Sequence, residues 1–439
     1  MQEKRYVKPA DLYVNKIGED QWTCFNPGSG GGVVVIPASV KAILEKCHAE
    51  NVEESSVLDA LASRGVVIDM ANNATVQVSQ ISRKSASYWF HVTNRCNLRC
   101  TYCYINKDAE GMSIETARMT TARIIRDCKE KGITLVNFKF AGGEPMLAIP
   151  VIREVIRVAQ SDAGESCRAN YGIITNATAM TPSNALFLKE NGILVSVSLD
   201  GPQSSNDKAR LYTDGSGSYA DIIRGIDHLR NVGIQPLILT VVSPGNMEAL
   251  PEFMKWLISE GLCSRFSFCR DKEVLERYGM RRYQEDLSRY LRETYVVLGE
   301  NIPSIPMDRF HNTGNLNFSG RRTRYCGRGI NGYAVSHTGK FALCQETIGS
   351  PVVIGSGNHI SGFEDMDLAS EDISECHGCR SCQWRYVCGG DCPELKRKFF
   401  GSSSRPSPYC SVLQAVIPQL IDLRGKQLVK TNKAIKERR

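Results

Sequence analysis

Three cysteines near residue 100 have the side chain and the spacing of a metal site. Cys96, Cys100 and Cys103 lie in the stretch TNRCNLRCTYCYI with spacing C-x3-C-x2-C, and the next cysteine along the chain is Cys128. Structural zinc normally takes four protein ligands, and iron–sulfur clusters normally take four cysteines. Three cysteines leave one metal position open, which predicts a site that binds a small molecule at the metal.

A second group of cysteines lies at 320–439, in a loop-rich region. The chain has 17 cysteines in all, and a reducing compartment would not maintain a disulfide framework of this size. Metal clusters are therefore the better explanation, and they are expected to form much of the core of this small region. Its eight cysteines are Cys326, Cys344, Cys376, Cys379, Cys382, Cys388, Cys392 and Cys410.

Composition limits the class of protein. The chain has 439 residues with 42% hydrophobic and 23% charged side chains, which predicts a globular protein of several domains. No apolar run is long enough to span a membrane, and the charged start MQEKRYVKPADLY has no signal-peptide core, so we expect a cytoplasmic protein. The net charge of +7 falls partly on RGKQLVKTNKAIKERR, which predicts a solvated basic helix. Neither nucleic acid nor membrane is expected as a partner.

Strands and helices alternate through 85–310, and they would position the first cysteine group. Amphipathic stretches separate six short β-rich runs, a pattern that predicts an α/β fold with a parallel sheet or partial barrel. Working residues of such folds follow the carboxyl ends of the strands. The three-cysteine loop follows the first run, AGGEP the second, TNAT the third and SLDG the fourth. The runs are 88–93, 136–140, 170–175, 193–198, 236–242 and 265–269.

The first region, 1–80, combines a glycine-rich stretch with one strand and two helices. NPGSGGG is not followed by Lys-Ser or Lys-Thr, so it predicts a hairpin turn and not a phosphate loop. The strand is expected at 33–37, and the helices at about 38–50 and 54–64.

Two motifs carry a family resemblance. CNLRCTYC resembles the cluster-binding loop of the radical S-adenosylmethionine (radical SAM) superfamily. CGRGINGYAVSHTGKFALC, CRSCQWRYVCGGDC and Cys410 resemble the seven-cysteine pattern of the SPASM domain. The resemblance implies a partial (β/α)6 TIM-like barrel followed by a cysteine-rich iron–sulfur domain at 320–439.

The resemblance also implies a radical SAM oxidoreductase. Cys96, Cys100 and Cys103 would hold a 4Fe–4S cluster, and its open iron would bind the amino and carboxylate groups of S-adenosylmethionine. One electron would then split the sulfonium bond and give a 5′-deoxyadenosyl radical. The cofactors carry this chemistry, while the protein orients them.

Several residues would bind S-adenosylmethionine by motif. Gly142, Gly143 and Glu144 would meet its amino group, and Tyr102 would lie against its adenine. Asn176 and Ser198 would contact ribose or carboxylate, or else cap strand ends. Arg210 would pair with the cofactor carboxylate or be a surface charge, and Asp200 could be structural or functional.

The resemblance implies two auxiliary 4Fe–4S clusters, three clusters in all. Cys379, Cys382, Cys388 and Cys410 would hold one of them. Cys326, Cys344 and Cys392 would hold the other, which is one ligand short. Cys376 is the spare thiol nearby, so either Cys376 ligates this cluster or the cluster is open.

The substrate is suggested by the first region. GGVVVIPASVKAILEKC and SVLDALASRGVV resemble a winged-helix-like element that binds leader peptides, although a structural cap on the barrel is the alternative. This predicts a maturase that forms an oxidative carbon–carbon or thioether cross-link in a ribosomally made precursor peptide. The auxiliary clusters would take the electron, and flavodoxin or ferredoxin would be the donor.

Two other enzyme classes stay open at this point. One is an anaerobic sulfatase-type maturase, whose relatives carry an aspartate directly after the cysteine of G-x4-C. This chain has Gln345 there, which disfavours that class and leaves Glu346 as a substitute catalytic base. The other is a small-molecule radical dehydrogenase.

Overall fold

The computed structural model describes residues 6–47, 56–70, 84–302, 311–349 and 372–437. Parts of the predicted regions lie outside the described residues, namely 1–5, 48–55, 71–83, 303–310, 350–371 and 438–439.

A nine-stranded sheet forms the centre of the molecule, in the order β12-β11-β10-β9-β8-β7-β6-β13-β14. The six strands predicted from the sequence are confirmed as its parallel middle. Their side chains are buried on the face that the helices cover, where the hydroxyl of Tyr88 lies 3.8 Å from Sγ of Cys128 in the following helix, and partly buried on the other face. These strands are β6 (Ser85–Thr93), β7 (Leu135–Gly142), β8 (Arg168–Thr175), β9 (Leu194–Ser198), β10 (Leu237–Val242) and β11 (Cys263–Phe268).

Three short strands extend this sheet at its edges. β12 (His311–Thr313) pairs in parallel with β11, and β13 (Gly332–Val335) pairs in parallel with β6. β14 (Phe341–Ala342) completes a hairpin with β13. Because β13 and β14 come from the cysteine-rich region, that region is joined directly to the barrel sheet.

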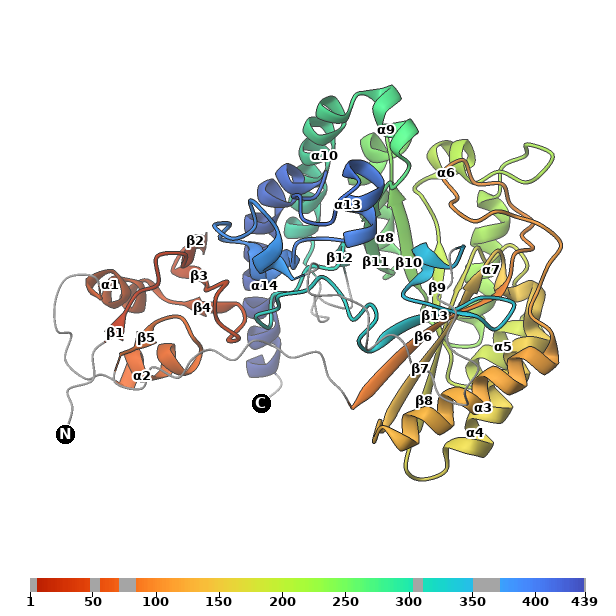
Figure 1. The fold of residues 1–439 in the computed structure, drawn as a ribbon. Coiled ribbons are helices and arrows are strands. Elements are labelled where there is room, and N and C mark those ends of the chain that lie inside the picture. The colour runs from red at the N-terminus through yellow and green to blue at the C-terminus, as the bar shows by residue number, and fades with distance from the viewer. Residues whose placement is uncertain (1–5, 48–55, 71–83, 303–310, 350–371, 438–439) are drawn as a thin grey trace.

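Helices cover the outer face of the curved sheet (Figure 1). α3 begins after Ser113, whose hydroxyl caps the backbone N–H of Thr116, and it buries Ile124 and Ile125 against the strands. The fold is therefore the predicted α/β partial barrel. The helices of the barrel are α3 (Ile114–Glu130), η1 (Pro145–Ala148), α4 (Ile149–Ala163), α5 (Pro182–Glu190), α6 (Gln203–Ala209), α7 (Tyr219–Asn231), η2 (Met247–Ala249), α8 (Leu250–Ser259), α9 (Lys272–Tyr278) and α10 (Met280–Glu300).

The N-terminal region has its own small core, built from Cys24, Leu44, Leu58 and Leu61. The predicted strand, the two helices and the hairpin turn at 26–32 are confirmed, since that turn joins two antiparallel strands. The other strands were not predicted. The elements are β1 (Tyr6–Val7), β2 (Tyr13–Gly18), β3 (Gln21–Phe25), β4 (Val34–Ile36), α1 (Ala38–Lys46), α2 (Ser56–Ser63) and β5 (Ile68–Asp69), with sheets β2-β3-β4 and β1-β5.

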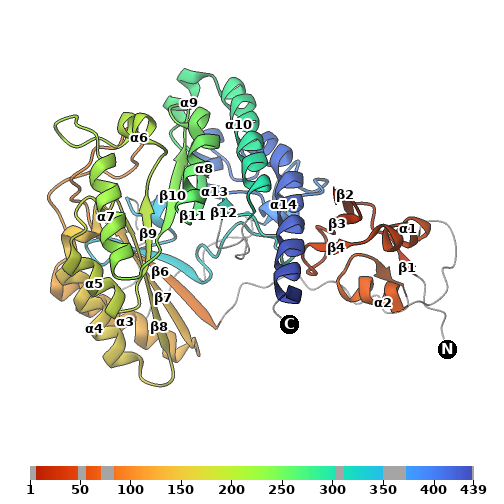
Figure 2. The ribbon, with the colours of Figure 1, turned by 180° about the vertical axis from the view of Figure 1, so that it is seen from behind.

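The C-terminal helix α14 (Cys410–Glu437) lies between the N-terminal sheet and α10, as both ribbon views show (Figures 1 and 2). A Cβ at Gly425 would lie 2.4 Å from Oγ1 of Thr23, so the glycine permits close packing on β3. No helix in the described part of the chain is both long and apolar enough to cross a bilayer. The remaining elements are η3 (Gln345–Thr347), η5 (Ile373–Glu375), α12 (Arg385–Cys388) and α13 (Pro393–Phe400).

Candidate iron–sulfur and cofactor site

The three-cysteine loop leaves the carboxyl end of β6, and backbone hydrogen bonds hold it in place. The N–H of Arg99 donates to the carbonyl of Leu211 (2.6 Å), and the N–H of Thr101 donates to that of Ala209 (3.0 Å). The segment after α6 therefore lies along the loop. Its predicted ligands Cys96, Cys100 and Cys103 are all unlinked and partly exposed.

Two glycines allow β7 to end against this loop. Gly142 has φ +134°, and a Cβ there would lie 2.5 Å from the carbonyl oxygen of Thr93. A Cβ on Gly143 would lie 2.1 Å from the carbonyl oxygen of Arg95. The structure thus explains both glycines by backbone contact with the cysteine loop.

Glu144 is buried, and protein donors occupy its carboxylate. It accepts from the hydroxyl of Thr175 (2.6 Å) and from the backbone N–H groups of Asn176 (2.7 Å) and Met146 (2.9 Å). Burial raises the pKa of Glu144, and these three hydrogen bonds oppose the shift. In this arrangement Glu144 fixes the carboxyl ends of β7 and β8 to each other.

Asn176 is the residue that β8 delivers to the cysteines. Its side-chain nitrogen donates to Oδ1 of Asn97 (3.0 Å) and lies 3.9 Å from Sγ of Cys96. Asn176 therefore lies directly beside the predicted cluster.

Arg210 is buried and is not a surface charge. Its Nε donates to Oδ2 of the fully buried Asp200 (2.9 Å), and its Nη1 lies 3.9 Å from Sγ of Cys100. The hydroxyl of Tyr102 donates to the same Asp200 oxygen, and the guanidinium lies 5.7 Å from the centre of the Tyr102 ring. Asp200 thus orients two side chains that border the cysteines.

Ser198 ends β9 and is partly buried, two residues before Asp200. Asp200 is fixed in turn by Asn246, whose amide donates to the Asp200 carbonyl (2.9 Å). The carboxyl ends of β6 to β10 therefore bring the predicted cofactor residues to one rim, as the strand order requires.

The donor set at this rim fits a 4Fe–4S cluster. Three thiols lie together with two polar side chains next to their sulfur atoms, and burial raises the pKa of Cys96 and of Cys100. Burial favours the protonated thiols, and metal binding would outweigh this effect because the metal binds the thiolates. In the described residues no three histidine, cysteine or acidic side chains converge tightly enough to hold a single metal ion. A four-iron cluster, by contrast, takes its ligands at separate corners.

Four of the C-terminal cysteines line one small cavity, which Trp384 and Ser407 also line. Burial raises the pKa of Cys388 to about 12. The cavity brings together the four cysteines predicted for one auxiliary cluster, which are Cys379, Cys382, Cys388 and Cys410.

Cys376 lies beside this group. Its Sγ is 3.2 Å from Sγ of Cys379, and both side chains are buried. The thiol of Cys379 donates to Cys376, which lowers the pKa of Cys376 and raises that of Cys379. The spare thiol therefore neighbours the complete set of four and not the incomplete set.

In the incomplete set, Cys392 lies beside the barrel residue Arg270. Cys344 precedes η3, Cys326 is exposed and Cys392 is buried. Arg270, just after β11, places Nη1 3.6 Å from Sγ of Cys392 and 3.0 Å from Oε1 of Glu346. The predicted base Glu346 is thus ion-paired near the rim of the barrel.

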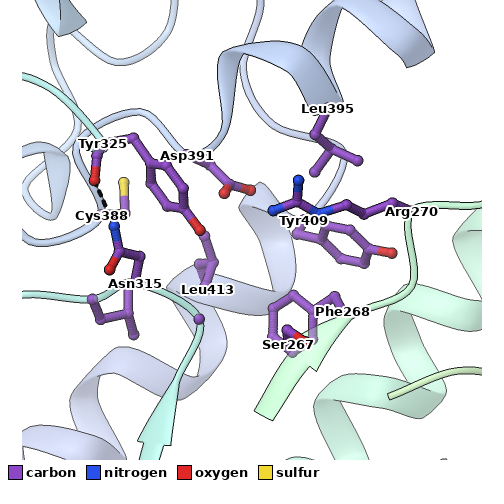
Figure 3. A pocket seen from close by; sticks show the side chains of 12 residues that line it. Ser267, Phe268, Arg270, Asn315, Tyr325, Cys388, Asp391, Leu395, Tyr409 and Leu413 are labelled. Carbon is purple, nitrogen blue, oxygen red and sulfur yellow. Dashed lines mark hydrogen bonds between the residues drawn. The ribbon is translucent and has the colours of Figure 1, made fainter. Parts of the chain in front are cut away.

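A small cavity lies between the barrel and the cysteine-rich region (Figure 3). The guanidinium of Arg270 enters it from the β11 side and points toward Asp391. Asp391 has φ +62° and accepts from the N–H of Cys392 (2.7 Å) and from the hydroxyl of Ser407. Asp391 therefore links the segments that carry Cys392 and Cys410.

The sequence interpretation missed Arg270 and the connecting role of Asp391. Arg270 had a signal, because it is the first charged side chain after the sixth strand of the barrel. No sequence signal pointed to the role of Asp391 other than its position between Cys388 and Cys392.

The fold and the rim define an iron–sulfur enzyme with a partial α/β barrel. Residues 90–257 match the Radical SAM superfamily. An uncharacterized protein of Methanocaldococcus jannaschii is 32% identical over 233 residues, which is 52% of this chain and 79% of the relative. Residues 90–257 therefore form a radical SAM domain.

More distant similarities cover more of the chain. A cysteine-type anaerobic sulfatase-maturating enzyme of Clostridium novyi is 24% identical over 349 residues, 72% of this chain and 90% of the relative. The structure of anSMEcpe with bound AdoMet and Cp18Cys peptide has a TM-score of 0.63 at 20% identity, covering 80% and 99% of the two chains. Streptococcus suis SuiB bound to precursor peptide SuiA has a TM-score of 0.52 at 15% identity, covering 91% and 98%. At these identities the two structures show a shared fold.

Proposed function

We propose that this chain is a peptide maturase that cross-links a ribosomally made precursor oxidatively. The observation that carries the proposal is the N-terminal unit, a small sheet with α1 and α2 that is packed on α14 beside the cysteine-rich region. The structural likeness to SuiB and anSMEcpe, both solved with bound peptides, supports a peptide substrate. The regions 1–80, 85–310 and 320–439 would then serve recognition, radical chemistry and electron transfer.

The chain's own residues would prepare the cofactor site. When bound, the cluster and S-adenosylmethionine would supply a radical that removes hydrogen from the peptide. Arg210 would present its guanidinium to the cofactor carboxylate, since Asp200 already holds it beside Cys100. Asn176 would offer its amide next to Cys96, and Glu144 would keep Asn176 in place.

The leader peptide would pair with a strand edge of the N-terminal sheet. In the described residues β4 pairs on one side only, with β3. Pro37 follows β4 and cannot donate to a strand ladder, so the pairing would be short. Backbone hydrogen bonds would supply the affinity. A cytoplasmic location and a flavodoxin or ferredoxin donor stay predictions.

A substrate-side experiment tests this function. Anaerobically reconstituted protein is incubated with precursor peptides from short neighbouring reading frames, once as the full precursor and once as the core without leader. We expect the full precursor to lose two hydrogens. The core without leader should be converted much more slowly, because only docking of the leader raises the local concentration of the core segment at the radical site. Excess free leader peptide should inhibit conversion of the full precursor, because it occupies the same strand edge. Equal conversion of both peptides would reduce the N-terminal unit to a structural cap, and no conversion would favour a small-molecule substrate.

The sulfatase-type alternative has support from the Clostridium novyi relative. Gln345 directly follows Cys344, where the resemblance expects an aspartate. An amide cannot take a proton near neutral pH, so this alternative is the weaker one.

A further inference from the structure

The cysteine-rich region does not offer a fourth cysteine to the incomplete auxiliary set. All 17 cysteines of the chain lie in described parts of it. Cys376, the spare thiol, lies 3.2 Å from Cys379 and so belongs to the other group. The set of Cys326, Cys344 and Cys392 therefore lacks a fourth cysteine from its own region, and another type of side chain can take the place.

Two carboxylates lie near Cys392, and they differ in how the protein uses them. Both oxygens of Asp391 are engaged, one by the N–H of Cys392 and the other by the hydroxyl of Ser407. Glu346, by contrast, forms an ion pair with Arg270 at 3.0 Å, and its side chain is 19% exposed. Glu346 is thus the carboxylate with freedom to turn toward a metal.

Arg270 fixes where Glu346 lies relative to the cysteines. Nη1 of Arg270 is within 3.6 Å of Sγ of Cys392 and within 3.0 Å of Oε1 of Glu346, so one guanidinium group bridges both side chains. Glu346 also follows Cys344 by two residues within η3. Two of the three cysteines therefore connect to Glu346, one along the chain and one through space.

We propose that Glu346 is the fourth protein ligand of the second auxiliary 4Fe–4S cluster, with Cys326, Cys344 and Cys392. A carboxylate oxygen is a harder ligand than a thiolate, so it would hold its iron less firmly than the cysteines hold theirs. Arg270 would then donate to Cys392 and lower the negative charge at the cluster. In this role Glu346 is not the catalytic base that the sequence suggested, because its oxygen is bound to iron.

Metal analysis tests this without any substrate. The parent protein is the full chain with Cys96, Cys100 and Cys103 replaced by alanine, so that only auxiliary clusters contribute; it should hold roughly eight irons after anaerobic reconstitution. In this background E346A should lose about four irons on treatment with a chelator. E346C should keep them and resist the chelator longer than the parent, since a thiolate replaces the carboxylate.

The matched control is Q345C, which adds a thiol one residue away. We expect Q345C to behave like the parent, and the electron paramagnetic resonance spectrum of the reduced protein to change in E346C and not in Q345C. Circular dichroism checks that E346A folds. Unchanged iron and spectrum in E346A would overturn the proposal, as would equal iron loss in E346A and E346C.

The inference rests on the proposed pair of auxiliary clusters and is independent of the peptide substrate. A parent with only about four irons would contradict the cluster assignment itself. A parent with roughly eight irons and an insensitive E346A would contradict only the role of Glu346.

Discussion

Tyr13 of β2 meets Trp384 of the cysteine-rich region edge to face, with ring centroids 6.0 Å apart. Trp384 is buried and lines the cavity of the four C-terminal cysteines. The hydroxyl of Tyr13 also donates to Asp422 of α14 (3.0 Å), and burial raises the pKa of Tyr13. The N-terminal unit is therefore attached to the wall of the cavity that these four cysteines line, so its removal would uncover that wall.

Replacing Tyr13 with alanine should loosen this attachment. We expect a loss of about 1–3 kcal/mol in the free energy of unfolding, because an aromatic pair and one hydrogen bond disappear. Denaturant titration followed by tryptophan fluorescence measures it. Lys16→Ala, an exposed change on the same strand, is the control and should have little effect. Equal stability of the two variants would mean that the ring contact contributes nothing.

His311 predicts an acid-sensitive step in stability. It is fully enclosed between the hydroxyls of Ser264 and Thr313, each 3.0 Å from a ring nitrogen, and burial lowers its pKa to about 3. Below the ordinary histidine pKa of about 6.5 the unfolded chain takes up a proton and the folded chain does not. The folded state should therefore lose roughly 1.4 kcal/mol from this group between pH 7.5 and 5.5.

His311→Gln should remove that part of the pH dependence, since glutamine is uncharged and can still donate and accept. Unfolding of both proteins at pH 7.5 and 5.5 gives the difference, and any acid effect on the clusters is common to both. A wild-type loss that is no larger than that of the variant would show that His311 does not set the acid sensitivity.

The sequence predicts the barrel because each strand is a short apolar run between helices with one apolar face. It predicts the rim because parallel strands place AGGEP, TNAT and SLDG at one edge, whatever the details of packing. The edge strands β12 to β14 were missed, since strands of two to four residues leave no periodic signal.

Contacts between segments far apart in the chain could not be predicted from the sequence. Glu144 was expected at the cofactor, and its bond to the backbone of Asn176 depends on the distance between β7 and β8. The sequence left open whether Cys376, as the spare thiol, ligates the incomplete set, and only the folded loop places it beside Cys379. Whether Arg210 was buried likewise depended on how the segment after α6 crosses the cysteine loop.

Glu144→Gln should disturb the cofactor site through Asn176. Glutamine has one acceptor oxygen, so it cannot serve the hydroxyl of Thr175 and the N–H of Asn176 together. An unsatisfied buried donor costs about 1–3 kcal/mol, and we expect roughly tenfold weaker binding of S-adenosylmethionine. Anaerobic equilibrium dialysis measures this affinity. Glu115→Gln on the exposed face of α3 serves as control, and equal affinity of the two variants would contradict the positioning role of Glu144.

The amide side chain of Gln345 leads us to expect that this protein does not carry out the sulfatase-type maturation reaction. By the family resemblance, sulfatase-type maturases form formylglycine and carry an aspartate directly after the cysteine of G-x4-C. This chain has an amide there, next to Cys344. Because an amide does not accept a proton near neutral pH, the reconstituted protein should not form formylglycine in a sulfatase peptide that offers cysteine or serine. Mass spectrometry of the peptide after incubation measures this, with 5′-deoxyadenosine production as proof that the enzyme is active. Gln345→Asp is the informative partner variant, because it supplies the missing carboxylate on an otherwise unchanged scaffold. Formylglycine made by the wild-type protein would disprove the prediction and favour the sulfatase-type class. Formylglycine made only by the Gln345→Asp variant would identify position 345 as the residue that separates sulfatase maturation from the proposed cross-linking.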